Sequence, residues 1–124
     1  MTAAAASRVF KTRWFSKAAK TAGITDKELC EAAAELTRGQ GDDLGGNVWK
    51  KRLDKNRQRG IVVNKVGERW IFVFLFAKAD RENIEQDELR AFKKLAKDYG
   101  KKKPEEIDRQ VKDGELLEIC HGRR

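Results

Sequence analysis

The residues best suited to chemistry in this sequence are lysines and arginines gathered in its middle. Between Gly45 and Arg81 there are ten basic and three acidic side chains, a balance of +7, whereas the whole chain carries +8. Such a concentration is typical of a surface that binds a polyanion, and a solvated basic surface without a partner is the alternative. The ten are Lys50, Lys51, Arg52, Lys55, Arg57, Arg59, Lys65, Arg69, Lys78 and Arg81.

Strand periodicity predicts how some of these side chains are arranged. Side chains alternate across a strand, so Lys50 and Arg52 should share one face, with Trp49 and Leu53 on the other. The neighbouring strands should bring further cations to the same rim of the sheet: Arg57, Arg59, Lys78 and Arg81. A polyanion-binding rim is therefore expected.

The elements that must position these residues begin with two helices. A short extended segment, 8–13, precedes a helix whose apolar positions recur from Phe15 until Gly23. In the next helix, Thr25 and Glu28 form a capping-box pattern in which each side chain satisfies a backbone donor, and Gly39 ends the helix.

Strands follow in the basic segment. Residues 39–46 contain four glycines and are expected to be a flexible connection. Three strands are then predicted at 48–53, 60–66 and 70–78. The apolar run Ile71–Phe76 is continuous rather than alternating, so the third strand should be central and covered on both faces.

A helix from Leu89 to Gly100 completes a predicted α+β domain over residues 1–100, in which residues 1–7 are expected to be disordered. Residues 101–124 form an extension, with a lysine linker and a helix from Pro104 to Asp113. We expect the extension to be dispensable for chemistry. It should dock through a set of apolar side chains: Ile107, Val111, Leu116, Leu117 and Ile119.

Composition excludes some classes of protein. The longest apolar run is far shorter than the roughly 18 residues of a membrane helix, and the start does not match a secretory signal, so a cytoplasmic protein is expected. Cys30 and Cys120 are far apart and lack paired spacing, and both are predicted to be reduced. Acidic residues at 80–88 are explained by a helix dipole, and neither a metal nor another cofactor is predicted.

Three segments together resemble the RelE/ParE toxin superfamily, and most specifically its RelE-like toxins. They are DDLGGNVWKKRL at 42–53, NRQRGI at 56–61 and FLFAKADRENI at 74–84. The resemblance covers approximately residues 8–99. It implies a RelE-like fold, with a small antiparallel sheet packed against two N-terminal helices and a C-terminal helix.

The resemblance also implies a function, that of a toxin in a toxin–antitoxin pair which cuts mRNA on the ribosome without metal and so inhibits translation. The catalytic residues implied by the matching motifs are Lys50, Arg52, Arg59, Lys78 and Arg81. The residues expected to bind RNA around them are Lys51, Lys55, Arg57, Trp49 and Phe76. The family's late tyrosine has no clear counterpart, because Tyr99 lies inside the last core helix, so Phe76 or Trp49 is expected to stack on substrate.

The chemistry of this cut requires a base for a ribose 2′-OH, cations around the phosphate, and an acid for the leaving oxygen. A lysine crowded by other cations can lose its proton near neutral pH, whereas arginine cannot. Lys50 is thus the candidate base, with Lys78 second, and the arginine forks suit the phosphate. His121 is expected to be an exposed tail residue.

Two other functions fit the same residues. One is a non-catalytic nucleic-acid binder or co-repressor that binds operator DNA together with its antitoxin. The other is a ParE-like inhibitor of DNA gyrase. For the toxin, a cognate antitoxin is the expected partner, and we expect a segment of it to cover the basic face and to bury Arg52 or Arg59. No membrane partner is expected.

Overall fold

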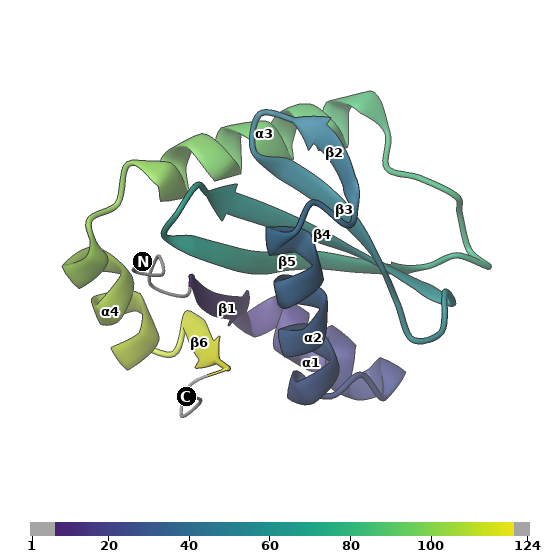
Figure 1. The fold of residues 1–124 in the computed structure, drawn as a ribbon, viewed down its shortest axis with the longest axis horizontal. Helices are drawn as coiled ribbons and strands as arrows, with labels where there is room; N and C mark the ends of the chain where they lie inside the picture. The colour runs from purple at the N-terminus through teal and green to yellow at the C-terminus, as the bar shows by residue number, and fades with distance from the viewer. Residues whose placement is uncertain (1–6, 121–124) are drawn as a thin grey trace.

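A six-stranded, mostly antiparallel sheet with four helices forms the described part of the chain, residues 7–120 of a computed structural model (Figure 1). The strand order is β2-β3-β4-β5-β1-β6. In chain order the elements are β1 (Arg8–Thr12), α1 (Arg13–Ala22), α2 (Asp26–Thr37), β2 (Asp42–Gly45), β3 (Val48–Leu53), β4 (Gln58–Lys65), β5 (Arg69–Ala77), α3 (Gln86–Gly100), α4 (Pro104–Lys112) and β6 (Leu116–Ile119). No helix of residues 7–120 is long and apolar enough to cross a membrane. The predictions for residues 1–6 and for His121 concern positions outside the described range.

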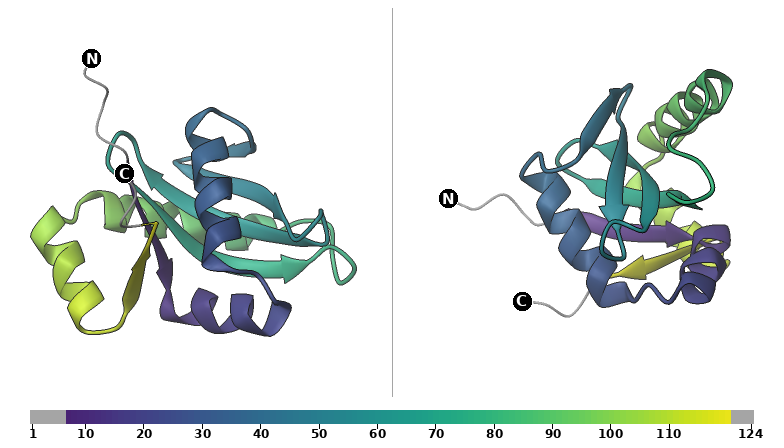
Figure 2. Two further views of the ribbon diagram at one scale, coloured as in Figure 1. Left: turned by 60° about the horizontal axis from the view of Figure 1, so that its bottom comes forward. Right: turned by 90° about the vertical axis from the view of Figure 1, so that its right-hand side faces the viewer.

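The central strand is β5, which lies between β4 and a parallel β1. Its residues are covered on both faces, which confirms the prediction from the continuous apolar run. On one face β5 packs with α1 and α2 around Phe15, Leu29 and Phe72. On the other it packs with α3 and α4 around Phe10, Ile61 and Ile107. Figure 2 shows α2 and α3 on opposite sides of the sheet, which gives three layers.

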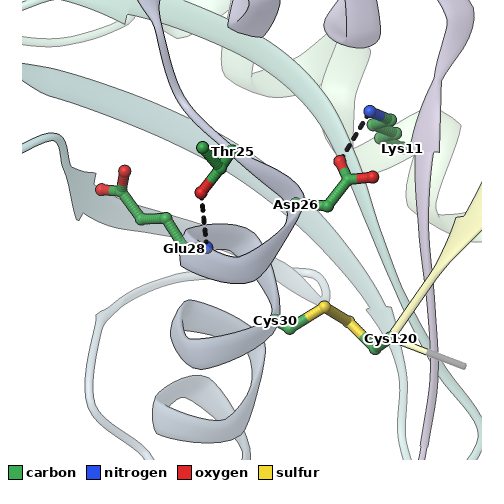
Figure 3. The surroundings of a disulfide bond; sticks show 6 residues. All are labelled: Lys11, Thr25, Asp26, Glu28, Cys30 and Cys120. Atoms are coloured by element: carbon green, nitrogen blue, oxygen red, sulfur yellow. Dashed lines mark hydrogen bonds and ion pairs between the residues drawn. A yellow bond between two sulfur atoms is a disulfide. The ribbon is translucent and has the colours of Figure 1, made fainter. Parts of the chain in front are cut away.

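The two N-terminal helices begin at threonine caps. Thr12 Oγ1 accepts from the backbone N–H of Phe15 at 3.1 Å, and Thr25 Oγ1 accepts from the N–H of Glu28 at 3.2 Å (Figure 3). Only half of the predicted capping box is present. The carboxylate of Glu28 accepts instead from the backbone N–H of Asp54, and this contact ties α2 to the β3–β4 turn.

The predicted flexible connection at 39–46 was wrong, because it contains strand β2. This short strand pairs antiparallel with β3, with Asp42 opposite Lys50. Its residues are mostly exposed and polar, so they lack the apolar alternation that identifies a strand in sequence. At Gly46, where φ is 61°, a Cβ atom would lie 2.8 Å from Cγ of Lys93 on α3, so glycine allows this close approach.

The C-terminal extension completes the sheet. Helix α4 begins at Pro104 as predicted, and the following apolar patch forms β6, which pairs antiparallel with β1. Ile107, Leu116 and Ile119 are buried, so α4 and β6 pack against the rest of the described structure. Leu117 was also predicted to dock, but it is 36% exposed, although alternation places it on the same face of β6 as the buried Ile119.

Cys30 and Cys120 form a disulfide, so the prediction that both are reduced was wrong (Figure 3). The two residues are 90 positions apart in sequence, but α2 and the end of β6 bring their Cα atoms to 5.5 Å. That separation lies within the range that a disulfide requires. The bond thus fastens the C-terminal strand to the second helix.

Candidate nucleic-acid interface

Strand β3 separates the predicted basic residues into two groups. Its buried end residues identify the two faces, because Val48 packs with the α3 side of the sheet and Leu53 with the α2 side. Lys50 and Arg52 share the face of Val48, whereas Trp49 and Lys51 share the face of Leu53. The predicted grouping of Lys50 with Arg52 is confirmed.

The α2 side of β3 is occupied by internal contacts. The Lys51 ammonium lies 2.7 Å from the carboxylate of Glu35 and donates to the carbonyl of Gln40. This ammonium holds the pKa of Glu35 below its ordinary value. The Trp49 ring packs edge-on against Trp70, with centroids 5.9 Å apart. The structure therefore does not bring Lys51 or Trp49 to the face that carries Lys50.

On the α3 side, two arginines stand directly opposite each other. Arg52 on β3 pairs in register with Arg59 on β4, which in turn pairs with Phe76 on β5. Opposite side chains in such a pair are about 5 Å apart at Cβ, and like charges at that spacing are destabilising unless an anion joins them. Arg59 is only 8% exposed, and its Nη1 donates to the carbonyls of Asn56 and Gln58 at 2.9 and 3.2 Å.

The turn between β3 and β4 has an unusual backbone. Asp54, Lys55 and Asn56 have φ values of 53°, 53° and 73°, in the left-handed region that residues other than glycine rarely adopt. Arg57 donates to the Asp54 carboxylate at 2.9 Å, and its own carbonyl accepts from the N–H of Lys78 at 2.9 Å. The turn and the end of β5 are therefore held together.

The ten basic residues between Gly45 and Arg81 fall into two groups, those with a carboxylate partner among residues 7–120 and those without one there. Six have a carboxylate partner: Lys50, Lys51, Arg57, Lys65, Arg69 and Arg81. The other four form no ion pair within residues 7–120, and we call them the basic rim: Arg52, Lys55, Arg59 and Lys78. The β3–β4 turn and the chain leaving β5 lie together at the right-hand end of the molecule in Figure 1.

Lys50 lies beside the rim but is not free of contacts. Its ammonium is 3.7 Å from the Asp42 carboxylate and donates to Asn83 Oδ1 at 3.3 Å. A hollow of about 340 Å³ is lined here by residues 40–42 and 50–52. The neighbours of this ammonium are thus an acid and an amide, not the crowd of cations expected from sequence.

Arg81 flanks the rim on its other side. Both Nη atoms donate to Glu88 at 2.9 Å, and the guanidinium lies over the rings of Phe76 and Phe74, 5.1 and 5.6 Å from their centroids. This pairing raises the pKa of Arg81 and lowers that of Glu88, which also accepts from the N–H of Glu85 at the start of α3. Phe76 is buried beneath Arg81, so it does not offer a free face for stacking.

Tyr99 lies at the other end of the sheet. Its carbonyl accepts from Arg69 Nη1 at 2.9 Å, and burial raises the pKa of its phenol. Tyr99 is therefore not part of the rim.

Trp14 is a residue of this face that the sequence did not single out. From the sequence alone, a tryptophan here is more often a core or sheet-packing residue than one that stacks on a base. In the structure it is 51% exposed and stacks on Phe74, with centroids 5.2 Å apart and ring planes at 18°. The sequence gives no local signal for this arrangement.

Comparison with known proteins identifies one family. A family model described as the RelE toxin of the RelE/RelB toxin–antitoxin system matches residues 7–119, beyond the residues 8–99 that carried the resemblance. No curated protein and no solved structure matches the chain. The α+β architecture is compatible with the RelE-like fold. Because the match spans almost all of the described residues, the chain belongs to the RelE toxin family, whose members act in a pair with an antitoxin.

Proposed function

We propose that this protein is a ribosome-dependent mRNA endonuclease that inhibits translation through attack of a ribose 2′-OH on the adjacent phosphate. The observation that carries the proposal is the basic rim, where Arg52 and Arg59 face each other without a carboxylate partner among residues 7–120. A polyanion relieves the repulsion between such cations, and RNA is the polyanion on which the family acts. The rim also repels a divalent cation, which favours a metal-free cut.

The proposed roles of the basic side chains follow from whether each can lose a proton: arginines bind the phosphate, and a lysine acts as the base. Arg52 and Arg59 keep their charge and present planar forks, so they clamp the phosphate as negative charge builds up on it. Lys50 is the proposed base and Lys78 the second candidate. The substrate must first displace the contacts that the Lys50 ammonium makes with Asp42 and Asn83.

We expect the ribosome to align the reacting groups of the message, which the basic rim alone does not do. Positioning of the 2′-OH in line with the phosphate contributes a large share of the barrier reduction in such reactions, and a ribosome that holds the message provides it. This dependence on ribosomes locates the activity in the cytoplasm. It also explains why a site poor in ordinary acid–base groups suffices.

We further propose that a small segment of the antitoxin covers the basic rim and buries Arg52, since Arg59 is already buried in the structure. Acidic side chains in that segment would complement a surface whose cations have no internal partner. Hydrogen exchange on the purified complex should show protection at the β3–β4 turn. Protection confined to residues beyond Gly100 would contradict this placement.

The test is cleavage of message in two settings. Induced expression with mapping of mRNA 5′ ends should show new ends within translated regions, and the purified protein should cut ribosome-bound message but not the same message alone. Arg52→Ala should reduce the cut. Lys112→Ala removes one exposed charge from α4 and should not. Binding of RNA without cleavage would favour a non-catalytic binder, and inhibited supercoiling without cleavage would favour a gyrase inhibitor.

A further inference from the structure

Trp14 is an exposed aromatic residue whose ring is held in a fixed place. It lies in the first turn of α1, which Thr12 caps, and its indole stacks nearly parallel on Phe74. Half of the side chain nevertheless stays exposed. A single exposed apolar residue needs no explanation by itself, so its surroundings decide whether it has a role.

The position of Phe74 connects Trp14 to the candidate site. Phe74 pairs in register with Ile61 on β4, and Ile61 pairs with Lys50 on β3. Two strand spacings, about 10 Å, therefore separate Phe74 from Lys50 on one face of the sheet. Arg81 lies over both Phe74 and Phe76, and Phe76 pairs with Arg59 of the basic rim. Trp14 thus borders the same face as the rim.

Two basic side chains flank Trp14 along α1. Arg13 precedes it, and Lys17 lies one turn further along α1; both are exposed, and neither forms an ion pair within the described residues 7–120. An aromatic ring with cations on either side suits a nucleic-acid strand, in which a flat base alternates with a charged phosphate.

We propose that Trp14 stacks on an unpaired base of the RNA strand whose phosphates lie along the basic rim. This inference rests on the proposed function and adds to it the residue that holds the strand. The indole face tolerates any base, so it fixes the position of the strand rather than its sequence. Trp14 takes the stacking role that the sequence assigned to Trp49 or Phe76, both of which are engaged in internal contacts.

Binding of a short single-stranded RNA tests the proposal, with an abasic version of the same strand as the second probe. Trp14→Leu should weaken binding of the intact RNA about 5- to 100-fold, and Trp14→Phe should weaken it less because a ring remains. The abasic strand should bind the parental protein as weakly as intact RNA binds Trp14→Leu. Val66→Ala, a change at an apolar residue that is 77% exposed in the β4–β5 turn, should leave affinity unchanged.

Tryptophan fluorescence gives an independent signal. Intact RNA should quench the emission of the parental protein, and Trp14→Phe should lose this quenching because Trp49 and Trp70 pack together on the α2 side. Thermal melting shows whether each variant is folded. Equal affinity of the parental protein and Trp14→Leu for RNA, or of the intact and abasic strands for the parental protein, would overturn the proposal.

Two further outcomes separate this proposal from the proposed endonuclease. Base-dependent binding that requires Trp14, without any cleavage of ribosome-bound message, supports the stacking role and refutes the endonuclease. Cleavage with no base-dependent binding refutes the stacking role alone. If Trp14→Leu weakens binding of the antitoxin but not of RNA, Trp14 belongs to a protein interface and the stacking role is refuted.

Discussion

The two ends of the β4–β5 hairpin each hold a buried arginine, and their surroundings differ. At the β4–β5 turn, Arg69 is 3% exposed, and its guanidinium donates to the Glu68 carboxylate at 3.0 Å and to the carbonyls of Tyr99 and Lys102. At the opposite end, the guanidinium of Arg59 donates to backbone carbonyls alone and stands across from Arg52.

We infer from this difference that Arg69 is a structural cation, whereas Arg59 is the one proposed to meet a ligand. Burying a charge is unfavourable unless it is paired and hydrogen-bonded. Around Arg69 the protein provides that pairing itself, because Glu68 and two backbone carbonyls accept from the guanidinium. We call this the closed end of the sheet, and the end at Arg59 the open end. Around Arg59 the hydrogen bonds are present, but the guanidinium forms no ion pair within residues 7–120, so we expect an anion from outside to stabilise this end. The number of basic residues in the segment does not make this distinction.

The largest expected effect concerns the disulfide, which fastens β6 to α2 outside the basic rim. Closing a loop of this length stabilises a fold by about 4.6 kcal/mol in the chain-entropy account, which is roughly two-thousandfold in the unfolding equilibrium. Paired Cys30→Ala and Cys120→Ala changes should therefore lower the free energy of unfolding by about that amount, as denaturant titration would show. Cleavage per folded molecule should stay near parental, and a large loss of cleavage in folded protein would show that the open end depends on this bond.

The second effect contrasts the two buried arginines. Arg59→Lys keeps the charge but loses the planar fork, so cleavage of ribosome-bound message should fall by about 10² to 10³ while the melting temperature changes little. Arg69→Lys should do the opposite, with stability lowered by about 2 kcal/mol through lost hydrogen bonds and cleavage per folded molecule retained. Similar profiles for the two variants would refute the distinction between the open and closed ends.

The third effect contrasts two adjacent lysines on the two faces of β3. Lys50→Ala should lower cleavage by about 10² with RNA binding largely kept, because it removes the proposed base. Lys51→Ala should leave cleavage within a few-fold of parental, because its ammonium pairs with Glu35 on the far face. The loss of this ion pair should cost less than about 1 kcal/mol of stability. Cleavage rates and thermal melting of both variants measure this. A folded Lys50→Ala protein with parental cleavage would exclude the lysine as base.

The smallest expected effect is on acid stability. The pKa of Glu88 lies below its ordinary value of 4.5 because of Arg81 and the N–H of Glu85, and that of Glu35 is lowered by Lys51. A carboxyl with a lowered folded-state pKa stabilises the fold above its unfolded pKa, and this contribution is lost as pH falls through the folded value. Melting temperature should therefore decline below about pH 4.5, with a modest slope because both groups are solvent-screened. Glu88→Gln should make the decline shallower, and an unchanged slope would contradict the role of this pair.

Local patterns in the sequence determined most of the elements. Caps and helical spacing act between residues three or four apart, and alternation along a strand acts between residues two apart, so α1, β3 and β5 were predictable. The same alternation placed Lys50 with Arg52. The charge count located the basic segment, and the roles of its residues in catalysis stay predictions.

The tertiary structure decided which of those residues are available. The Lys51–Glu35 and Arg81–Glu88 pairs, the Cys30–Cys120 bond and the Trp14–Phe74 stack join elements whose approach is set by packing of the whole sheet. Strand β2 likewise exists because β3 offers it an edge, not because its own residues favour a strand. Contacts between residues far apart in sequence produce no periodic pattern in the sequence. Whether such residues interact depends on the distance between them in the folded protein.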